Sequence, residues 1–208
     1  MKIFLLFLFP FLFMDAGEKF LTDIPAYQKD SYFKLKVYAE HNSKSFYQLK
    51  EANEIIQPDN YDSHLLNAAV FFATNKLREE KKLKSLQFSA ELRDAAVVHT
   101  QQMVDKKFFS HMNSKTPKLR SPDERMRMFG ATFTASAENI DWNNILMPSN
   151  TTHLQLADKI VDAWFHSPPH KKNMLSKQLS HLGCAAAFEP KNKNSARYIK
   201  ATQDFILK

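Results

Sequence analysis

Cysteine and glycine are scarce in this chain. Its 208 residues include one cysteine and three glycines. A single cysteine excludes an intramolecular disulfide and any zinc site built from several thiolates. So few glycines argue against a glycine-rich loop that cradles phosphate groups. Because Cys184 lies in the apolar run 182–188, we expect its thiol to be buried and unreactive.

Long apolar runs are also lacking, apart from residues 3–13. This run follows Lys2 and precedes Asp15 and Ala16, which is the pattern of a secretory signal peptide. It is too short to cross a bilayer, which takes about 20 apolar residues. We therefore predict a signal peptide over residues 1–16, a secreted or periplasmic mature protein, and no transmembrane helix once the signal is removed.

A strong excess of charge of either sign is missing as well. Lys and Arg number 29 against 22 Asp and Glu, a net charge of +7, and 44% of the residues are hydrophobic. These values are typical of a soluble globular protein. The lysine-rich segments 81–84 and 191–200 do not interleave aromatic residues as a nucleic-acid surface does, so we expect solvated faces and no nucleic-acid partner.

A turn signal, Pro-Asp-Asn at residues 58–60, divides the chain. Residues 17–61 have weak hydrophobic periodicity and are predicted to form an N-terminal extension with helices near 30–39 and 45–56. From residue 62 onward, apolar residues recur at intervals of three and four. This spacing predicts amphipathic helices within a domain over residues 62–208.

Helix-start signals bound the predicted helices of that domain. Ser121 and Thr152 each precede a Glu or Gln by three residues, as in a capping box. Ser167 precedes a proline, which suits a first helical position, so the Ser167 side chain is predicted to cap a helix. The predicted helices span residues 62–82, 89–107, 121–130, 152–164 and 167–175.

The C-terminal part changes character. Segments 182–188 and 197–207 are predicted to be strands joined by a polar turn. Helices followed by terminal strands predict an α+β fold with an antiparallel sheet under helices. The aromatic pairs at 71–72 and 108–109 are predicted to lie in the core.

One acidic residue stands out because apolar residues flank it. Glu138 follows Ala137 and lies two residues before Ile140, and a buried carboxylate is costly unless it is paired. Histidine is the natural partner, since imidazole titrates near neutrality and also ligates metals. His111 and His170, each beside apolar or aromatic residues, are the candidates.

Taken together, these segments resemble the CAP superfamily (cysteine-rich secretory proteins, venom antigens and plant pathogenesis-related proteins), in its bacterial SCP-like branch. They follow one another in the order that the family shows, across about residues 62–207. The segments are 75–78 (Asn-Lys-Leu-Arg), 92–96 (Leu-Arg-Asp-Ala-Ala), 108–111 (Phe-Phe-Ser-His), 121–125 (Ser-Pro-Asp-Glu-Arg), 137–140 (Ala-Glu-Asn-Ile), 164–170 (Trp-Phe-His-Ser-Pro-Pro-His), 173–175 (Asn-Met-Leu) and 182–184 (Leu-Gly-Cys).

The resemblance implies a three-layer α-β-α sandwich with a small antiparallel sheet between helices. The N-terminal helical extension over residues 17–61 lies outside the resemblance and adds to this fold. It also implies a central cleft, which two histidines and two acids often line in the family and where they can hold a divalent metal. By position, His111 and His170 match the histidines, and Glu138 matches one acid. Asn139 and Ser167 are the further ligand-binding residues expected in this cleft.

The sequence departs from the family pattern at two positions. Ser167 stands where the second acid is usual, and Ala137 replaces a glycine, so the four-residue metal site is incomplete. A divalent metal such as zinc on His111 and His170, with Glu138 as third ligand or as general base, is one hypothesis. The alternative is that both histidines only tie loops to Glu138 through hydrogen bonds. No cofactor is certain.

The leading functional hypothesis is a secreted, non-enzymatic module that binds an extracellular ligand or partner in a cleft organised by His111, Glu138 and His170. The first alternative is a divalent-metal-dependent hydrolase, peptidase-like or nuclease-like, with Glu138 as the candidate catalytic residue. The second is a structural envelope protein. By analogy with the family, the ligand is a lipid, a cell-wall component or a protein, and analogy at the level of the fold does not choose among them.

Overall fold

The computed structural model describes residues 17–28, 30–144, 150–191 and 197–208. The signal peptide predicted over residues 1–16 lies outside the described residues. Within the described part of the chain, none of the helices has the length and apolar character that a membrane span requires.

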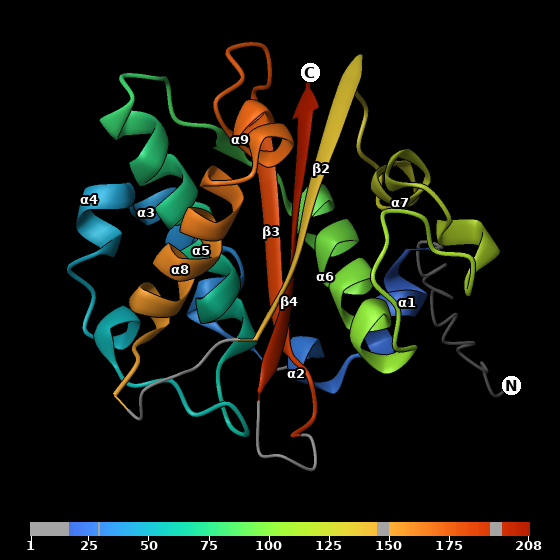
Figure 1. The fold of residues 1–208 in the computed structure, drawn as a ribbon, viewed down its shortest axis with the longest axis horizontal. Coiled ribbons are helices and arrows are strands. Elements are labelled where there is room, and N and C mark those ends of the chain that lie inside the picture. The colour runs from blue at the N-terminus through green and yellow to red at the C-terminus, as the bar shows by residue number, and fades with distance from the viewer. Residues whose placement is uncertain (1–16, 29, 145–149, 192–196) are drawn as a thin grey trace, which may run out of the picture.

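A four-stranded sheet forms the middle layer (Figure 1). Its strands are β1 (Gln87–Phe88), β2 (Ala135–Asn144), β3 (His181–Phe188) and β4 (Tyr198–Leu207), in the order β1-β3-β4-β2 across the sheet. The strands β3 and β4 confirm the two predicted strands. The β3–β4 and β2–β4 pairs are antiparallel, whereas β1 is parallel to β3. The sheet is therefore mixed, with two strands that the prediction lacked. Strand β2 escapes prediction because Ala, Asn, Glu and Asp, which have low strand propensity, dominate it.

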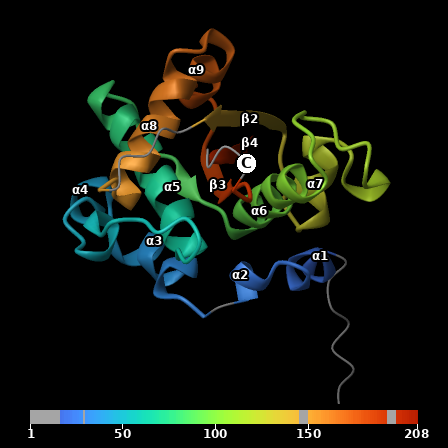
Figure 2. The same cartoon turned by 60° about the horizontal axis from the view of Figure 1, so that its bottom comes forward.

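Helices cover both faces of the sheet, as Figures 1 and 2 show. On one face α5 (Ser63–Glu80) packs on β3 and on α8 (His153–Phe165), and α9 (Pro168–Met174) contacts β2. On the other face α6 (Ala90–Asp105) packs on β3 and β4, and α7 (Pro122–Met128) contacts α6. This arrangement is the predicted α-β-α sandwich.

The helix starts in the domain are largely those predicted. The Ser89 side chain caps α6, and capping boxes at Ser121 and Thr152 begin α7 and α8. Helix α9 begins at Pro168, as predicted, but the hydroxyl of Ser167 makes no capping hydrogen bond. The role of Ser167 as a side-chain cap is thus wrong.

The N-terminal extension consists of short pieces instead of the two longer helices predicted at 30–39 and 45–56. The second of these ends early because the side-chain amide of Asn53 donates to the carbonyls of Tyr47 and Leu49, which competes with helical hydrogen bonds. The pieces are α1 (Glu18–Thr22), α2 (Pro25–Gln28), α3 (Lys36–Glu40), α4 (Ser43–Phe46) and 3-10 turns at Tyr32–Lys34 and Glu51–Asn53. Helices α1 and α2 lie against α6 and α5 (Figure 2).

The apolar core lies on both sides of the sheet. Cys184 is buried in it, and burial raises the pKa of its thiol well above the usual value, in agreement with an unreactive cysteine. Phe71 and Phe72 are core residues as predicted. Phe109 is not, because 42% of it is exposed.

Candidate functional site

The carboxylate of Glu138 lies on the α6 and α7 side of β2 and is almost fully enclosed, with a side chain that is 2% exposed. The Nδ1 atom of His111 donates to its Oε1 atom over 2.7 Å. The Nη2 atom of Arg125 donates to its Oε2 atom over 2.6 Å. The structure therefore places His111 and Glu138 together and adds Arg125.

Arg125, on α7, ties the surrounding loops to this carboxylate. It is fully buried. Its Nη1 atom donates to the carbonyls of Leu119 and Arg120 over 3.2 Å, and its Nη2 atom also donates to the carbonyl of His111 over 3.0 Å. The sequence around Arg125 shows a well-capped helix start at Ser121, which by itself does not distinguish Arg125 from a solvent-exposed cation.

These donors keep Glu138 ionised. Burial by itself raises the pKa of a carboxyl group, but the hydrogen bond from His111 and the charge of Arg125 outweigh burial, so the pKa of Glu138 is lowered. The buried ion pair places a fixed negative charge directly behind the imidazole of His111.

Two further buried residues that the sequence did not flag lie near Glu138. Asp204, on β4, is its direct partner in the antiparallel register. Burial, together with the charge of Glu138, raises the pKa of Asp204 well above the usual value, which favours its protonated form. His99, on α6, bonds through Nε2 to the carbonyl of Ser110 at 3.1 Å, and burial lowers the pKa of His99 to about 4.

His170 takes part differently from His111. Its carbonyl, and not its ring, accepts a hydrogen bond from the side-chain amide of Asn139 at 3.1 Å. Asn139 also bonds to Gln203 and Asn173, so it acts as a structural link between β2, β4 and α9. Among the described residues, no hydrogen bond or ion pair joins the His170 ring to Glu138.

Burial lowers the pKa of His170, and the nearby His111 lowers it further. The two rings therefore lie within electrostatic range of each other. The hydroxyl of the half-buried Ser167 has no hydrogen bond to this cluster in the described part of the chain. Of the five predicted site residues, the structure joins His111 and Glu138 directly by their side chains.

This arrangement does not fit the divalent metal that the family resemblance implies. Within the described residues, no group of three or more His, Cys, Asp or Glu side chains could hold a metal ion. Both carboxylate oxygens of Glu138 already accept hydrogen bonds, and the positive charge of Arg125 would oppose a cation at that position.

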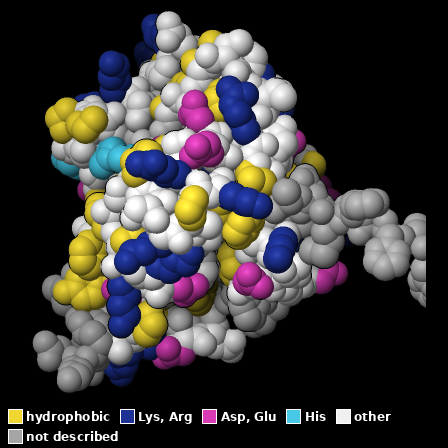
Figure 3. Space-filling model, turned by 90° about the vertical axis from the view of Figure 1, so that its right-hand side faces the viewer, with side chains coloured by type: hydrophobic (Ala, Val, Ile, Leu, Met, Phe, Trp, Pro, Cys, Tyr) yellow, Lys and Arg dark blue, Asp and Glu magenta, His cyan; other side chains and the backbone are white. Residues whose placement is uncertain are grey.

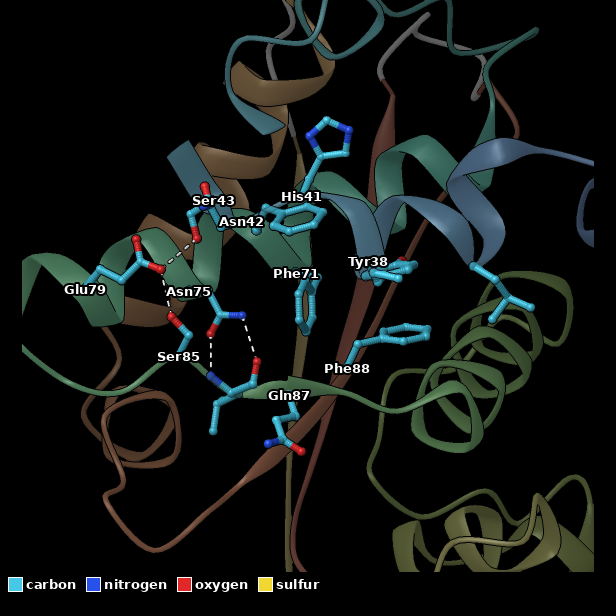
Figure 4. Close-up of a pocket in the computed structure, with 14 residues that line it drawn as sticks. Tyr38, His41, Asn42, Ser43, Phe71, Asn75, Glu79, Ser85, Gln87 and Phe88 are labelled. Atoms are coloured by element: carbon cyan, nitrogen blue, oxygen red, sulfur yellow. Dashed lines mark hydrogen bonds between the residues drawn. The ribbon is translucent and has the colours of Figure 1, made fainter. Parts of the chain in front are cut away.

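Concave surfaces of the described chain also lie elsewhere. The pocket in Figure 4 has a volume of about 450 Å³ and lies between the N-terminal extension, α5 and β1. Its polar end is already paired internally, because Glu79 accepts hydrogen bonds from Ser43 and Ser85, and Asn75 bonds to the backbone of Leu86 in both directions. We therefore interpret this pocket as part of the packing interface between the N-terminal extension and the domain.

Comparison with known proteins finds a matching family and several similar chains. The family model of cysteine-rich secretory proteins, CAP, matches residues 71–205. The Bacillus subtilis protein YkwD is 31% identical over 110 residues, which are 53% of this chain and 38% of YkwD. The Bacillus subtilis membrane protein YlbC is 23% identical over 179 residues, which are 83% of this chain and 45% of YlbC. This chain thus spans less than half the length of these curated relatives.

A solved structure shares the fold. It is that of an extracellular protein containing an SCP domain from Bacillus anthracis, with a TM-score of 0.55 and 24% sequence identity. The match covers 74% of this chain and 44% of that chain. At this level of identity the likeness is one of architecture.

Proposed function

This chain belongs to the CAP family of cysteine-rich secretory proteins, and from that premise we propose that it is an extracellular ligand-binding module and not an enzyme. The Bacillus anthracis relative is described as extracellular, which supports the proposed location. The predicted signal peptide over residues 1–16 agrees with it.

This proposal rests on the observation that both carboxylate oxygens of Glu138 already accept hydrogen bonds. A general base or a metal ligand needs a free oxygen, yet His111 and Arg125 donate to both oxygens of this carboxylate. What remains for a ligand is the His111 ring, whose side chain is 48% exposed. Its Nε2 atom has no hydrogen-bond partner among the described residues.

Glu138 therefore acts as a positioning residue for His111. A carboxylate that accepts from Nδ1 fixes the orientation of the ring and leaves Nε2 as an acceptor toward solvent when the ring is neutral. A ligand group that donates a hydrogen bond, such as a hydroxyl or an amide, fits this site. The metal-dependent hydrolase finds no support in this geometry, since its cation has no place beside Arg125.

The test measures the nuclear magnetic resonance signals of the His111 ring directly. Protein labelled with ¹⁵N at the histidine rings is titrated with two probes, phosphatidylglycerol vesicles and muramyl dipeptide. We expect saturable shifts of the His111 ring signals with at least one probe, and a loss of affinity of about tenfold in His111→Ala.

His166→Ala is the matched control, because the His166 side chain is 71% exposed and should not change binding. If neither probe shifts the His111 signals, the proposal is wrong. It is equally wrong if a probe is chemically converted at a rate that depends on His111, or if one equivalent of zinc binds and is lost in both His111→Ala and His170→Ala.

A further inference from the structure

A further concave surface lies on the side of the sheet that α6 covers, which is also the side of Glu138. It is formed where the end of α6 meets β2 and the end of β3. Its volume is about 660 Å³, which is within the range of small-molecule sites. Phe109 and Trp142 line it, together with charged side chains around its rim. None of the residues assigned above to the His111 site is needed to form it.

The aromatic side chains in this pocket are unusually open to solvent. Trp142 is 49% exposed and Phe109 is 42% exposed. Their ring centroids lie 5.9 Å apart with an interplanar angle of 45°, and Tyr198 packs against Trp142 at the same centroid distance. Large exposed aromatic surfaces on a soluble domain mark contact sites.

A buried lysine holds this aromatic surface in place. The Lys200 side chain is 3% exposed and forms an ion pair with Glu189 at 2.8 Å. Its Nζ atom donates to the carbonyls of Met103 and Phe108 and lies 5.2 Å from the centroid of the Trp142 ring. The pocket is thus ordered in advance, which lowers the entropic cost of binding a ligand.

The rim carries charges of both signs. Lys107 and Lys191 are exposed cations, and Asp105 is an exposed anion. A lipid chain would favour a wholly apolar lining, and a nucleic acid would favour an unbroken basic groove. Donors and acceptors around aromatic faces suit a neutral ring that has C–H groups on its face and hydroxyls on its edge. The face of the molecule around α7 likewise mixes Lys and Arg with Asp and Glu (Figure 3).

We propose that this pocket binds a neutral oligosaccharide, whose sugar rings stack on Trp142 and Phe109 and whose hydroxyls bond to the rim. This site goes beyond the function proposed for His111 and stands on different residues. Lys200 is a positioning residue for the stack, because it contacts the ring of Trp142 and not the ligand.

Tryptophan fluorescence isolates this site. The chain has two tryptophans, and the other, Trp164, is fully buried, so an emission change caused by a ligand reports Trp142. We expect cellotetraose or chitotetraose to produce a saturable change in emission, with the same affinity by calorimetry. Trp142→Ala should weaken binding measured by calorimetry about tenfold or more, whereas Trp142→Phe keeps a ring and should lose less.

Tyr32→Ala removes a ring that is 37% exposed on the extension and should leave sugar binding unchanged. His111→Ala should also leave it unchanged, which separates this proposal from the preceding one. The proposal is overturned if neither tetrasaccharide binds saturably, if binding survives Trp142→Ala in a folded protein, or if phosphatidylglycerol vesicles and not sugars change the Trp142 emission.

Discussion

Two buried carboxyl groups, those of Glu138 and Asp204, lie beside each other in the sheet. Because two like charges at this distance repel each other, only one of the groups favours its ionised form. Glu138 and Asp204 are direct cross-strand partners, and both are buried. Arg125 and His111 donate to Glu138, whereas neither carboxyl oxygen of Asp204 finds a donor in the described chain. The negative charge therefore resides on Glu138, and Asp204 is the carboxyl group that favours its protonated form.

This assignment predicts the pH dependence of Asp204→Asn. The pKa of Asp204 is raised in the folded state, so above the usual carboxyl value of about 3.9 the folded chain keeps a proton that the unfolded chain has lost. The contribution of Asp204 to the free energy of unfolding therefore falls as the pH rises from 4 toward 7. An asparagine does not titrate, so it does not cause this loss. We expect the variant to gain stability relative to the native chain over that range, by up to about 1.4 kcal/mol per pH unit.

Urea unfolding at pH 4, 5.5 and 7 measures this difference. The native chain alone is less informative, because His99, whose pKa is lowered to about 4, contributes stability that is lost as the pH falls from about 6.5. Asp105→Asn, at an exposed carboxylate, is the control for the general effect of removing an acidic group. Parallel curves for the native chain and Asp204→Asn would contradict a proton on Asp204.

For single residues, the sequence predicts that Glu138 is buried and needs a partner, but it does not predict all of the partners. The apolar neighbours of Glu138 predict its burial and a histidine beside it, and His111 fills that role. Arg125 and Asp204 could not be found in the same way, because each lies in a segment whose periodicity suggests an ordinary helix or strand. His170 matched the family position, yet its carbonyl makes the contact.

Among the elements, β4 shows where a pattern misleads. Lys200, Thr202 and Asp204 alternate along one face, which usually predicts a solvent-facing side. All three are buried because α6 covers them: the hydroxyl of Thr100 donates to Thr202 over 2.8 Å, and Lys200 donates to the carbonyl of Met103 in the last turn of that helix. The position of a covering helix cannot be obtained from the alternation of a strand.

The close approach of β3 and α6 predicts an effect of Gly183→Ala. A Cβ atom at this position would lie 2.1 Å from the backbone nitrogen of Arg93 and 2.3 Å from the carbonyl carbon of Leu92. Backbone atoms cannot yield as a side-chain tip can, so we expect a loss of about 3 kcal/mol or more, measured by urea unfolding.

Gly130→Ala is the matched control. Its φ of +89° disfavours a side chain, but no atom lies within 4 Å of the added Cβ, so we expect a smaller loss, of about 1–2 kcal/mol. Equal losses in the two variants would show that helix α6 and strand β3 can separate at little cost.

Across the whole molecule, the N-terminal extension contributes to the same apolar cluster as the domain. Val37, Phe46 and Ile56 belong to the cluster that includes Trp164 and Phe205. The weak periodicity of residues 17–61 predicts an extension with two helices and does not show that it packs into the core of the domain. Buried residues that lie singly on short helices do not recur at helical intervals. This part of the fold could therefore not be predicted from the sequence.

This shared core predicts that extension and domain unfold together. Phe46 is fully buried and stacks on Phe72 with a centroid distance of 4.3 Å. Phe46→Ala should cost about 3–5 kcal/mol, whereas Leu35→Ala, at a residue that is 52% exposed, should change stability by about 0.5 kcal/mol or less. Urea unfolding followed by far-ultraviolet circular dichroism and by tryptophan emission, to which the buried Trp164 contributes, should give one coincident transition in each variant. If Phe46→Ala left the transition of tryptophan emission at its native midpoint, the extension would be an independent attachment and not part of the core.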